Sequence, residues 1–110
     1  MDAVTAVSGS GPAYVFYFME AVQQAAMDMG LSAAAARQLT LETFLGAAKL
    51  AESSPEDVAV LRARVTSKGG TTEQAILSMQ TAGVQAAIVD AVHAAARRSK
   101  ELGDALANAA

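Results

Sequence analysis

The chain has 110 residues, which is enough for one domain and too few for two. Hydrophobic residues make up 53% of the sequence but aromatic residues only 5%, so an Ala-rich core buries little area per side chain and favours completion by a partner surface. The net charge of −3 argues against a nucleic-acid-binding protein, and the lack of cysteine excludes disulfides, cysteine-ligated zinc and a thiol nucleophile.

Membrane and targeting segments are not evident in the sequence. No uninterrupted apolar run reaches about 18 residues, which argues against a membrane-spanning helix. The N-terminus lacks the basic and then apolar segments of a secretory signal. No cluster of His, Asp and Glu predicts a metal site. We therefore expect a cytoplasmic protein without nucleic-acid or membrane partners.

Two long helices are predicted in the first half of the chain. Pro12 suits the first turn of a helix, where its missing N–H leaves no carbonyl unpaired. That helix is predicted to end before Gly30, which suits the left-handed position after a helix. Ser32 then caps a second helix that continues to about Ala51.

Three further helices are predicted in the second half. Ser54 would cap a short third helix, with Pro55 at its first position and Asp57 as the capping-box acid. Gly83 separates a fourth helix from a long last helix over about residues 84–106. The buried stripe predicted on this last helix consists of Ile88, Ala91, Val92, Ala95 and Leu102. No segment alternates with the period of a strand, so the predicted fold is all-α, with about five helices.

The segment RVTSKGGTTEQ, residues 64–74, interrupts the helical pattern with glycines and hydroxyls. Thr71 or Thr72 can cap the fourth helix, with Gln74 as the capping-box partner. Such a helix start presents unpaired N–H groups that favour a carboxylate or phosphate, and Lys68 adds a positive charge. From spacing alone, a plain helix–helix turn with a threonine cap is the favoured interpretation. A second small-residue segment, SGSGPAY, precedes the first helix and offers the same chemistry.

Other candidates for chemistry are weaker. His93 lies three residues after Asp90 on the last helix, but a single His on a helix more often has a structural role or is exposed. Glu20 has no second carboxylate at a spacing typical of acid–base pairs.

Four segments, in the same order along the chain, resemble the C-terminal helical domain of pyrroline-5-carboxylate reductase. They are AVSGSGPAYVF, LGAAKL, RVTSKGGTT and AVHAAARRSKEL, and the resemblance extends from about Ala3 to Leu102. It implies an oxidoreductase that reduces 1-pyrroline-5-carboxylate to L-proline with NADPH or NADH, the last step of proline biosynthesis. It also implies a homodimer with interlocking helical domains and an active site at their interface, and it allows rings of such dimers.

The resemblance assigns roles to both small-residue segments. In the family, the glycine–threonine loop binds the substrate carboxylate through backbone N–H groups. The substrate-binding residues implied here are Ser67, Gly69, Gly70, Thr71 and Thr72. The Thr72 hydroxyl is the implied catalytic group, hydrogen-bonded to the ring nitrogen. The second loop would lie beside the nicotinamide and the substrate, and it comprises Ser8, Gly9, Ser10, Gly11 and Pro12.

The sequence departs from the family pattern in two ways. Lys68 stands where the family most often has Pro, which changes the rigidity of the loop and adds a charge. The Rossmann fingerprint G-x-G-x-x-G and any βαβ pattern are missing from residues 1–110. We therefore interpret residues 1–110 as the dimerisation and substrate-binding domain alone, either an excised domain, a truncated gene product or an engineered fragment, and inactive by itself. Its preference for NADPH or NADH cannot be predicted without the cofactor-reading residues.

Two other interpretations of the sequence remain open. One is a helical homodimer assembly module that has retained no catalysis. The other is the helical domain of a different NAD(P)-dependent dehydrogenase.

Overall fold

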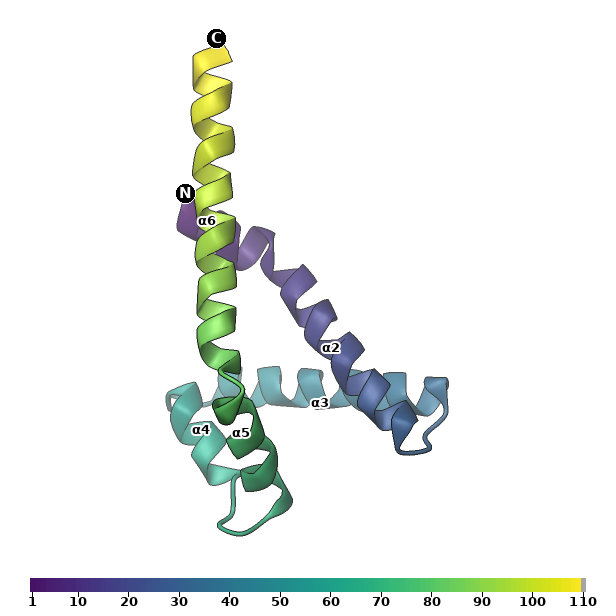
Figure 1. The fold of residues 1–110 in the computed structure, drawn as a ribbon. Coiled ribbons are helices and arrows are strands. Elements are labelled where there is room, and N and C mark those ends of the chain that lie inside the picture. Colours follow the sequence, from purple (N-terminus) through teal and green to yellow (C-terminus); the bar gives the residue numbers. More distant parts are fainter. Residues whose placement is uncertain (110) are drawn as a thin grey trace. The chain divides into compact units, whose positions relative to one another are not determined.

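The computed structural model describes residues 1–109, which are helical almost throughout (Figure 1). In chain order the elements are α1 (Asp2–Val4), the π-helical turn η1 (Thr5–Gly9), α2 (Gly11–Asp28), α3 (Ala33–Ser53), α4 (Val58–Arg64), α5 (Thr71–Thr81) and α6 (Val84–Ala109). The described residues contain no strand, and α2 to α6 are the five predicted helices, so the all-α prediction is confirmed.

Two compact units divide the chain between them. The first consists of Met1–Val15 together with the residues from Ile76 on, and the second is Phe16–Ala75. Each unit is described by itself.

In the first unit, α1 and η1 lie against α6 (Figure 1). Ala6, the buried residue of η1, is only 1% exposed. The Ser99 hydroxyl of α6 donates a hydrogen bond to Oδ1 of Asp2 at 2.9 Å, between residues 97 positions apart in the sequence. This bond and the burial of Ala6 fix the first residues of the chain on α6.

The prediction of a loop before the first helix was wrong. Residues 2–9 are helical, first as α1 and then as η1. The physical reason is their packing on α6, because burial against another helix overrides the low helix propensity of Ser and Gly.

The predicted buried stripe of α6 is only partly covered within one chain. Val92 and Ala95 are half-buried, whereas Ala91 is exposed, Ile88 is 50% exposed and Leu102 is 54% exposed. The short α1 and η1 cover only part of the length of α6 (Figure 1). The rest of the stripe therefore has no cover from its own unit.

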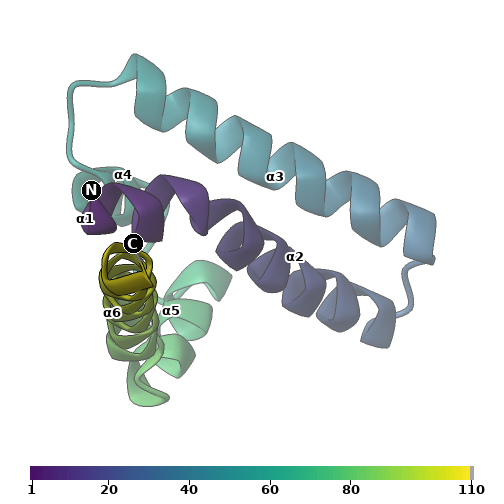
Figure 2. The ribbon, with the colours of Figure 1, turned by 90° about the horizontal axis from the view of Figure 1, so that it is seen from above.

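In the second unit, α2 and α3 are joined by a short turn that the sequence predicted (Figure 2). Gly30 has a φ of 102°, the left-handed value expected after a helix. Oγ of Ser32 accepts a hydrogen bond from the Ala35 N–H at 3.1 Å, which confirms Ser32 as the cap of α3. Local capping chemistry therefore fixes this turn.

Side chains of α2 and α3 meet in the second unit. The rings of Phe18 and Phe44 pack edge to face with their centroids 5.6 Å apart. Ala36 and Thr40 of α3 are buried, and Leu61 is the buried residue of α4.

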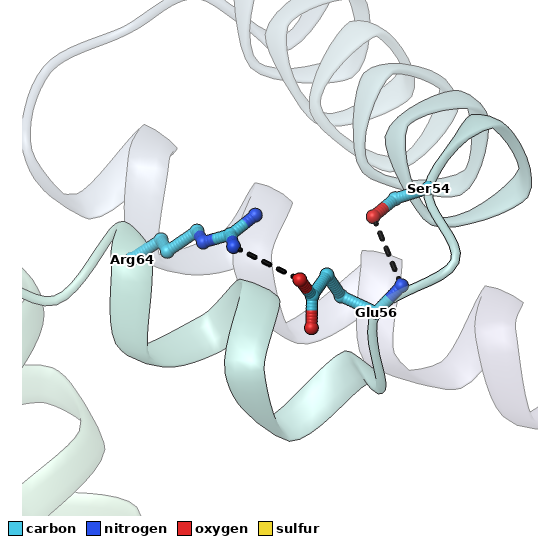
Figure 3. Close-up of polar contacts among 3 residues, drawn as sticks. All are labelled: Ser54, Glu56 and Arg64. Carbon is cyan, nitrogen blue, oxygen red and sulfur yellow. Dashed lines mark hydrogen bonds and ion pairs between the residues drawn. The ribbon is translucent and has the colours of Figure 1, made fainter.

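The start of α4 differs from the prediction. The helix begins at Val58, and its N-cap is Asp57 rather than Ser54. Oγ of Ser54 accepts a hydrogen bond from the Glu56 N–H at 3.2 Å (Figure 3). This local turn uses the hydroxyl that the prediction assigned to the helix start.

Large apolar side chains remain exposed in both units. Among them are Leu45 (57%), Val58 (71%), Ile88 (50%) and Leu106 (76%). The buried apolar residues of the described chain are only Ala6, Ala36 and Leu61. One chain therefore does not close a hydrophobic core of its own.

A membrane-spanning helix needs both a minimum length and a high mean hydropathy. No single helix meets both requirements, and α5 and α6 reach them only as a pair bent by 55°.

The cap of α3 gives a first prediction about stability. Replacing Ser32 by Ala removes the acceptor for the Ala35 N–H, and we expect a loss of about 1 kcal/mol in the free energy of unfolding. The control Ser32→Asp keeps an acceptor and should retain most of that stability. Urea unfolding of the three proteins at one concentration measures the difference, and equal midpoints would contradict the assigned cap.

Candidate functional site

The glycine–threonine segment begins where α4 ends. Arg64 is the last residue of α4, and the Thr66 hydroxyl donates a hydrogen bond to the Arg62 carbonyl at 2.6 Å. Nη2 of Arg64 also forms an ion pair with Oε1 of Glu56 at 3.2 Å (Figure 3). Both side chains of this pair are largely exposed, so it contributes little stability, but it holds the end of α4 to the turn before that helix.

Residues 67–70 form a tight turn. The Gly70 N–H donates to the Ser67 carbonyl at 3.1 Å, and Gly69 has a φ of 77°. Since no non-glycine residue among residues 1–109 has a positive φ, Lys68 occupies the second position and Gly69 the third position of a type II turn. The second position of such a turn favours Pro, and the third favours Gly.

The same turn leads into α5. The first described residue of α5 is Thr71, so the N-cap position falls on Gly70, and the Gln74 N–H makes the first ladder bond to the Gly70 carbonyl at 3.3 Å. The N–H groups of Thr71, Thr72 and Glu73 lie in the first turn, where a helix offers them no carbonyl partner. These three N–H groups are the donors that the segment offers to an anion.

Glu73 closes this turn in a way that the sequence analysis missed. Its Oε1 accepts a hydrogen bond from the Gly69 N–H at 3.1 Å, four residues earlier. The predicted capping-box partner was Gln74, on the assumption that a threonine caps α5. Because the cap is Gly70, the residue three positions after the cap is Glu73. The sequence carries no clear signal for this bond, because a capping-box acid accepts from the N–H of the cap itself, whereas Glu73 accepts from the residue before the cap.

The geometry revises the donors that were expected to hold a carboxylate. Gly69 donates to Glu73 and Gly70 donates to Ser67, so these two N–H groups are occupied in this structure. Thr71 is exposed, and Thr72 is half-buried. The first-turn N–H groups and the Thr72 hydroxyl are thus the groups of this segment that an incoming carboxylate can reach.

The second predicted segment, residues 8–12, belongs to the other unit. Ser8 and Gly9 end η1, Ser10 links it to α2, and Gly11 and Pro12 begin α2. The position of Pro12 in the first turn of α2 confirms that part of the prediction. The segment is therefore a π-helical turn running into a helix, where a loop was expected.

Hydrogen bonds within the first unit hold this second segment. The Ser8 hydroxyl donates to the Val4 carbonyl at 2.9 Å, and the Tyr14 hydroxyl donates to the Ala6 carbonyl at 2.8 Å. The sequence predicts no role for Tyr14. The bond that it forms depends on a π-helical register, for which the sequence carries no clear signal.

The weaker candidates gain no support. His93, Asp90 and Glu20 are all exposed. The described residues contain no group of three or more His, Asp or Glu side chains placed to hold a metal ion. A shallow depression of about 210 Å³ in the second unit is lined by Phe16, Met19, Glu20, Gln23, Arg37 and Leu41.

Comparison with known proteins identifies related sequences and folds. The family profile for pyrroline-5-carboxylate reductase dimerisation matches residues 1–102. A pyrroline-5-carboxylate reductase of Pseudomonas aeruginosa is 54% identical over 106 residues, covering 96% of this chain and 39% of the relative. One of Synechocystis is 48% identical over 103 residues, covering 94% of this chain and again 39% of the relative.

Solved structures agree with the sequence relatives. A pyrroline carboxylate reductase of Plasmodium falciparum with NADP bound superimposes with a TM-score of 0.90 at 35% identity, covering 94% of this chain and 42% of that protein. The chain thus spans well under half the length of the relatives that it matches. The match over residues 1–102 shows that the chain belongs to the pyrroline-5-carboxylate reductase dimerisation family.

Proposed function

We propose that this chain is the dimerisation and substrate-binding part of a pyrroline-5-carboxylate reductase, which reduces 1-pyrroline-5-carboxylate to L-proline in proline biosynthesis. The observation that carries the proposal is the start of α5, where the predicted glycine–threonine segment forms a helix N-terminus with first-turn N–H donors beside Thr72. Family membership supports the same reaction. The cytoplasm stays the predicted compartment.

The substrate carboxylate would bind at the first turn of α5. Its oxygens would accept hydrogen bonds from the N–H groups of Thr71 and Thr72, where the helix dipole also favours negative charge. The Thr72 hydroxyl would then hydrogen-bond the ring nitrogen and so fix which carbon faces the hydride donor. Thr72 is the catalytic residue of this proposal, while Ser67, Gly69 and Gly70 shape the turn that holds the donors.

NADPH or NADH would supply the hydride, and the NADP-bound relative from Plasmodium falciparum supports this cofactor class. Residues 8–12 are proposed to face the nicotinamide. The family resemblance of this segment supports that placement. The nucleotide-binding fold itself is not proposed within this chain.

A homodimer is the assembly that the exposed apolar surface supports. Apolar side chains on α3 and α6 lie half or more in solvent within one chain, and a second copy can cover them. The name of the matching family supports dimerisation. An assembly module without catalysis would form the same dimer, so ligand binding is the measurement that separates the two functions.

The dimer prediction is tested by sedimentation equilibrium. We expect a species of twice the 11.2 kDa chain mass. Ile88→Glu places a charge on the half-exposed stripe of α6 and should weaken the dimer by at least about tenfold, because a charge buried at an interface loses its hydration. Gln85→Glu, at an exposed polar position one turn earlier, is the matched control. A stable wild-type monomer would rule out the proposed assembly.

The role of Thr72 is tested by thermal melting with and without L-proline, the proposed product. The wild-type melting temperature should rise with millimolar L-proline, since a ligand that binds only the folded state stabilises it. Thr72→Ala should remove most of that rise while the unliganded melting temperature stays nearly unchanged, because the cap of α5 is Gly70. Thr81→Ala, at the other end of α5, is the control.

Other outcomes of this experiment also decide between functions. A folded dimer that ignores L-proline favours the assembly module without catalysis. A larger melting shift with another small acid favours the helical domain of a different NAD(P)-dependent dehydrogenase.

Glu73 gives a third prediction for the same site. Its carboxylate accepts from Gly69 beside the proposed substrate carboxylate, so its negative charge opposes binding. Glu73→Gln keeps an acceptor for the Gly69 N–H but removes the charge, and we expect the half-saturating concentration of L-proline to fall about twofold to fivefold. Glu52→Gln on α3 should leave it unchanged. Weaker binding by the Glu73 variant would contradict this role.

A further inference from the structure

A mostly apolar seam runs along α6 with the spacing of a coiled coil. Its residues recur alternately four and three positions apart, and they are Ile88, Val92, Ala95, Ser99, Leu102 and Leu106. This spacing averages about 3.5 residues, close to one turn of a helix, so the six side chains share one narrow face. Such a seam is typical of a helix that packs along another helix.

Within one chain, α1 and η1 cover the middle of this seam. Its middle residues are half-buried, and the Ser99 hydroxyl donates to Oδ1 of Asp2 at 2.9 Å where α1 lies on α6. Beyond this point α6 continues past α1 (Figure 1). There Leu102 is 54% exposed and Leu106 is 76% exposed. Residues 102–109, the α6 extension, therefore present two leucines that α1 and η1 do not cover.

Most of the α6 extension lies outside the family match. The family profile for dimerisation ends at residue 102, whereas α6 remains helical to Ala109. Leu106 keeps the spacing of the seam across that end. The seam thus runs from the region matched as a dimerisation domain into residues that the match does not cover.

The charged side chains at this end of α6 leave the seam free to pack. Two ion pairs form within the helix, Arg98 with Glu101 at 3.1 Å and Lys100 with Asp104 at 2.9 Å. None of these four residues occupies a seam position, and all four side chains are more than half exposed. Gly103 and Ala105, next to the leucines, are small enough to let another helix approach closely. Burying the two leucines would therefore not require these charges to leave water.

A second copy of α6 is the partner that fits this seam. Two helices stay in contact over several turns only when both carry the same 3.5-residue period. In a twofold dimer the same surface lies on both partners, so a seam with this period can meet itself. Two leucines from each copy supply far less than the roughly 800 Å² that each partner of a stable complex buries. The extension therefore suits a dimer that other surfaces also hold together.

We propose that the α6 extension pairs with the α6 extension of a second copy, burying Leu102 and Leu106 of both chains and lengthening the dimer interface beyond the region that the family profile matches. This inference rests on the proposed function only through the homodimer, and it involves no ligand or cofactor.

The first test measures the dimer with a charge placed in the seam. Leu106→Glu is compared with Asn108→Glu, which adds the same charge two residues further on and outside the seam. Both side chains are exposed within one chain, so the fold of that chain should tolerate either change. In sedimentation equilibrium, Leu106→Glu should raise the dissociation constant of the dimer at least about tenfold, and Asn108→Glu less than about twofold.

The second test identifies the helix that covers the extension. Because the chain has no cysteine, a single substitution introduces a single thiol. Leu106→Cys places that thiol in the seam, and Asn108→Cys places it outside the seam. At concentrations where the chain is dimeric, a short bismaleimide should join two copies of Leu106→Cys and should join copies of Asn108→Cys several-fold less.

The possible failures can be told apart. Equal dissociation constants for the two glutamate variants would overturn the inference while leaving the homodimer in place. Equal cross-linking of the two cysteine variants would also overturn it, because a different helix of the second copy would then cover the extension. A wild-type chain that stays monomeric throughout would overturn the proposed homodimer and this inference with it.

Discussion

The shortage of buried apolar area within one chain is the constraint on which the rest of this structure depends. Alanine dominates the helices, and the buried apolar residues of the described chain are Ala6, Ala36 and Leu61. Since packing normally supplies most of the stability of helices in proteins, helices with so little internal cover need a second surface. The exposed apolar side chains of α3 and α6 are therefore the surface that a second copy would cover in the proposed dimer.

Local hydrogen bonds stabilise the ends of the helices, where one chain supplies little apolar packing. Ser32 caps α3, Glu73 closes the turn before α5, and Tyr14 supports the π-turn before α2. Each of these bonds joins residues within eight positions of one another, so each can form before any partner binds. Both candidate segments are thus shaped by bonds within one chain.

The predictions from sequence succeeded where the determining chemistry is local. Gly30, Ser32 and Gly83 mark helix ends because a left-handed glycine or a serine cap acts on its immediate neighbours. The loop predicted for residues 8–12 was wrong at Ser8 and Gly9, because their helical form depends on α6, which follows them by most of the chain. Ser54 was wrongly predicted as the cap of α4. Its hydroxyl can accept a hydrogen bond either at a helix start or in a local turn, and here it accepts from the Glu56 N–H of a local turn.

The candidate site divides in the same way. Resemblance to a family was enough to single out residues 67–72, and the helix start itself followed from glycine and threonine. The sequence could not show which N–H groups are already hydrogen-bonded, because Gly70 and Thr71 are comparable candidates for the cap of α5. Moving the cap from Thr71 to Gly70 changes the residue three positions later from Gln74 to Glu73, which is the acceptor found here. The bond from the Tyr14 hydroxyl to the Ala6 carbonyl could not be predicted either, since a π-turn has no clear sequence signature.

Lys68 is the residue of this turn that departs from the pattern that the family resemblance implies. Pro at the second position of a type II turn fixes φ permanently, and Lys68 gives up that restraint. The bond from the Gly69 N–H to Glu73 restrains the same turn from the opposite side, and it is reversible. The restraint on this turn can therefore be released, whereas a proline at its second position would keep the turn equally rigid at all times.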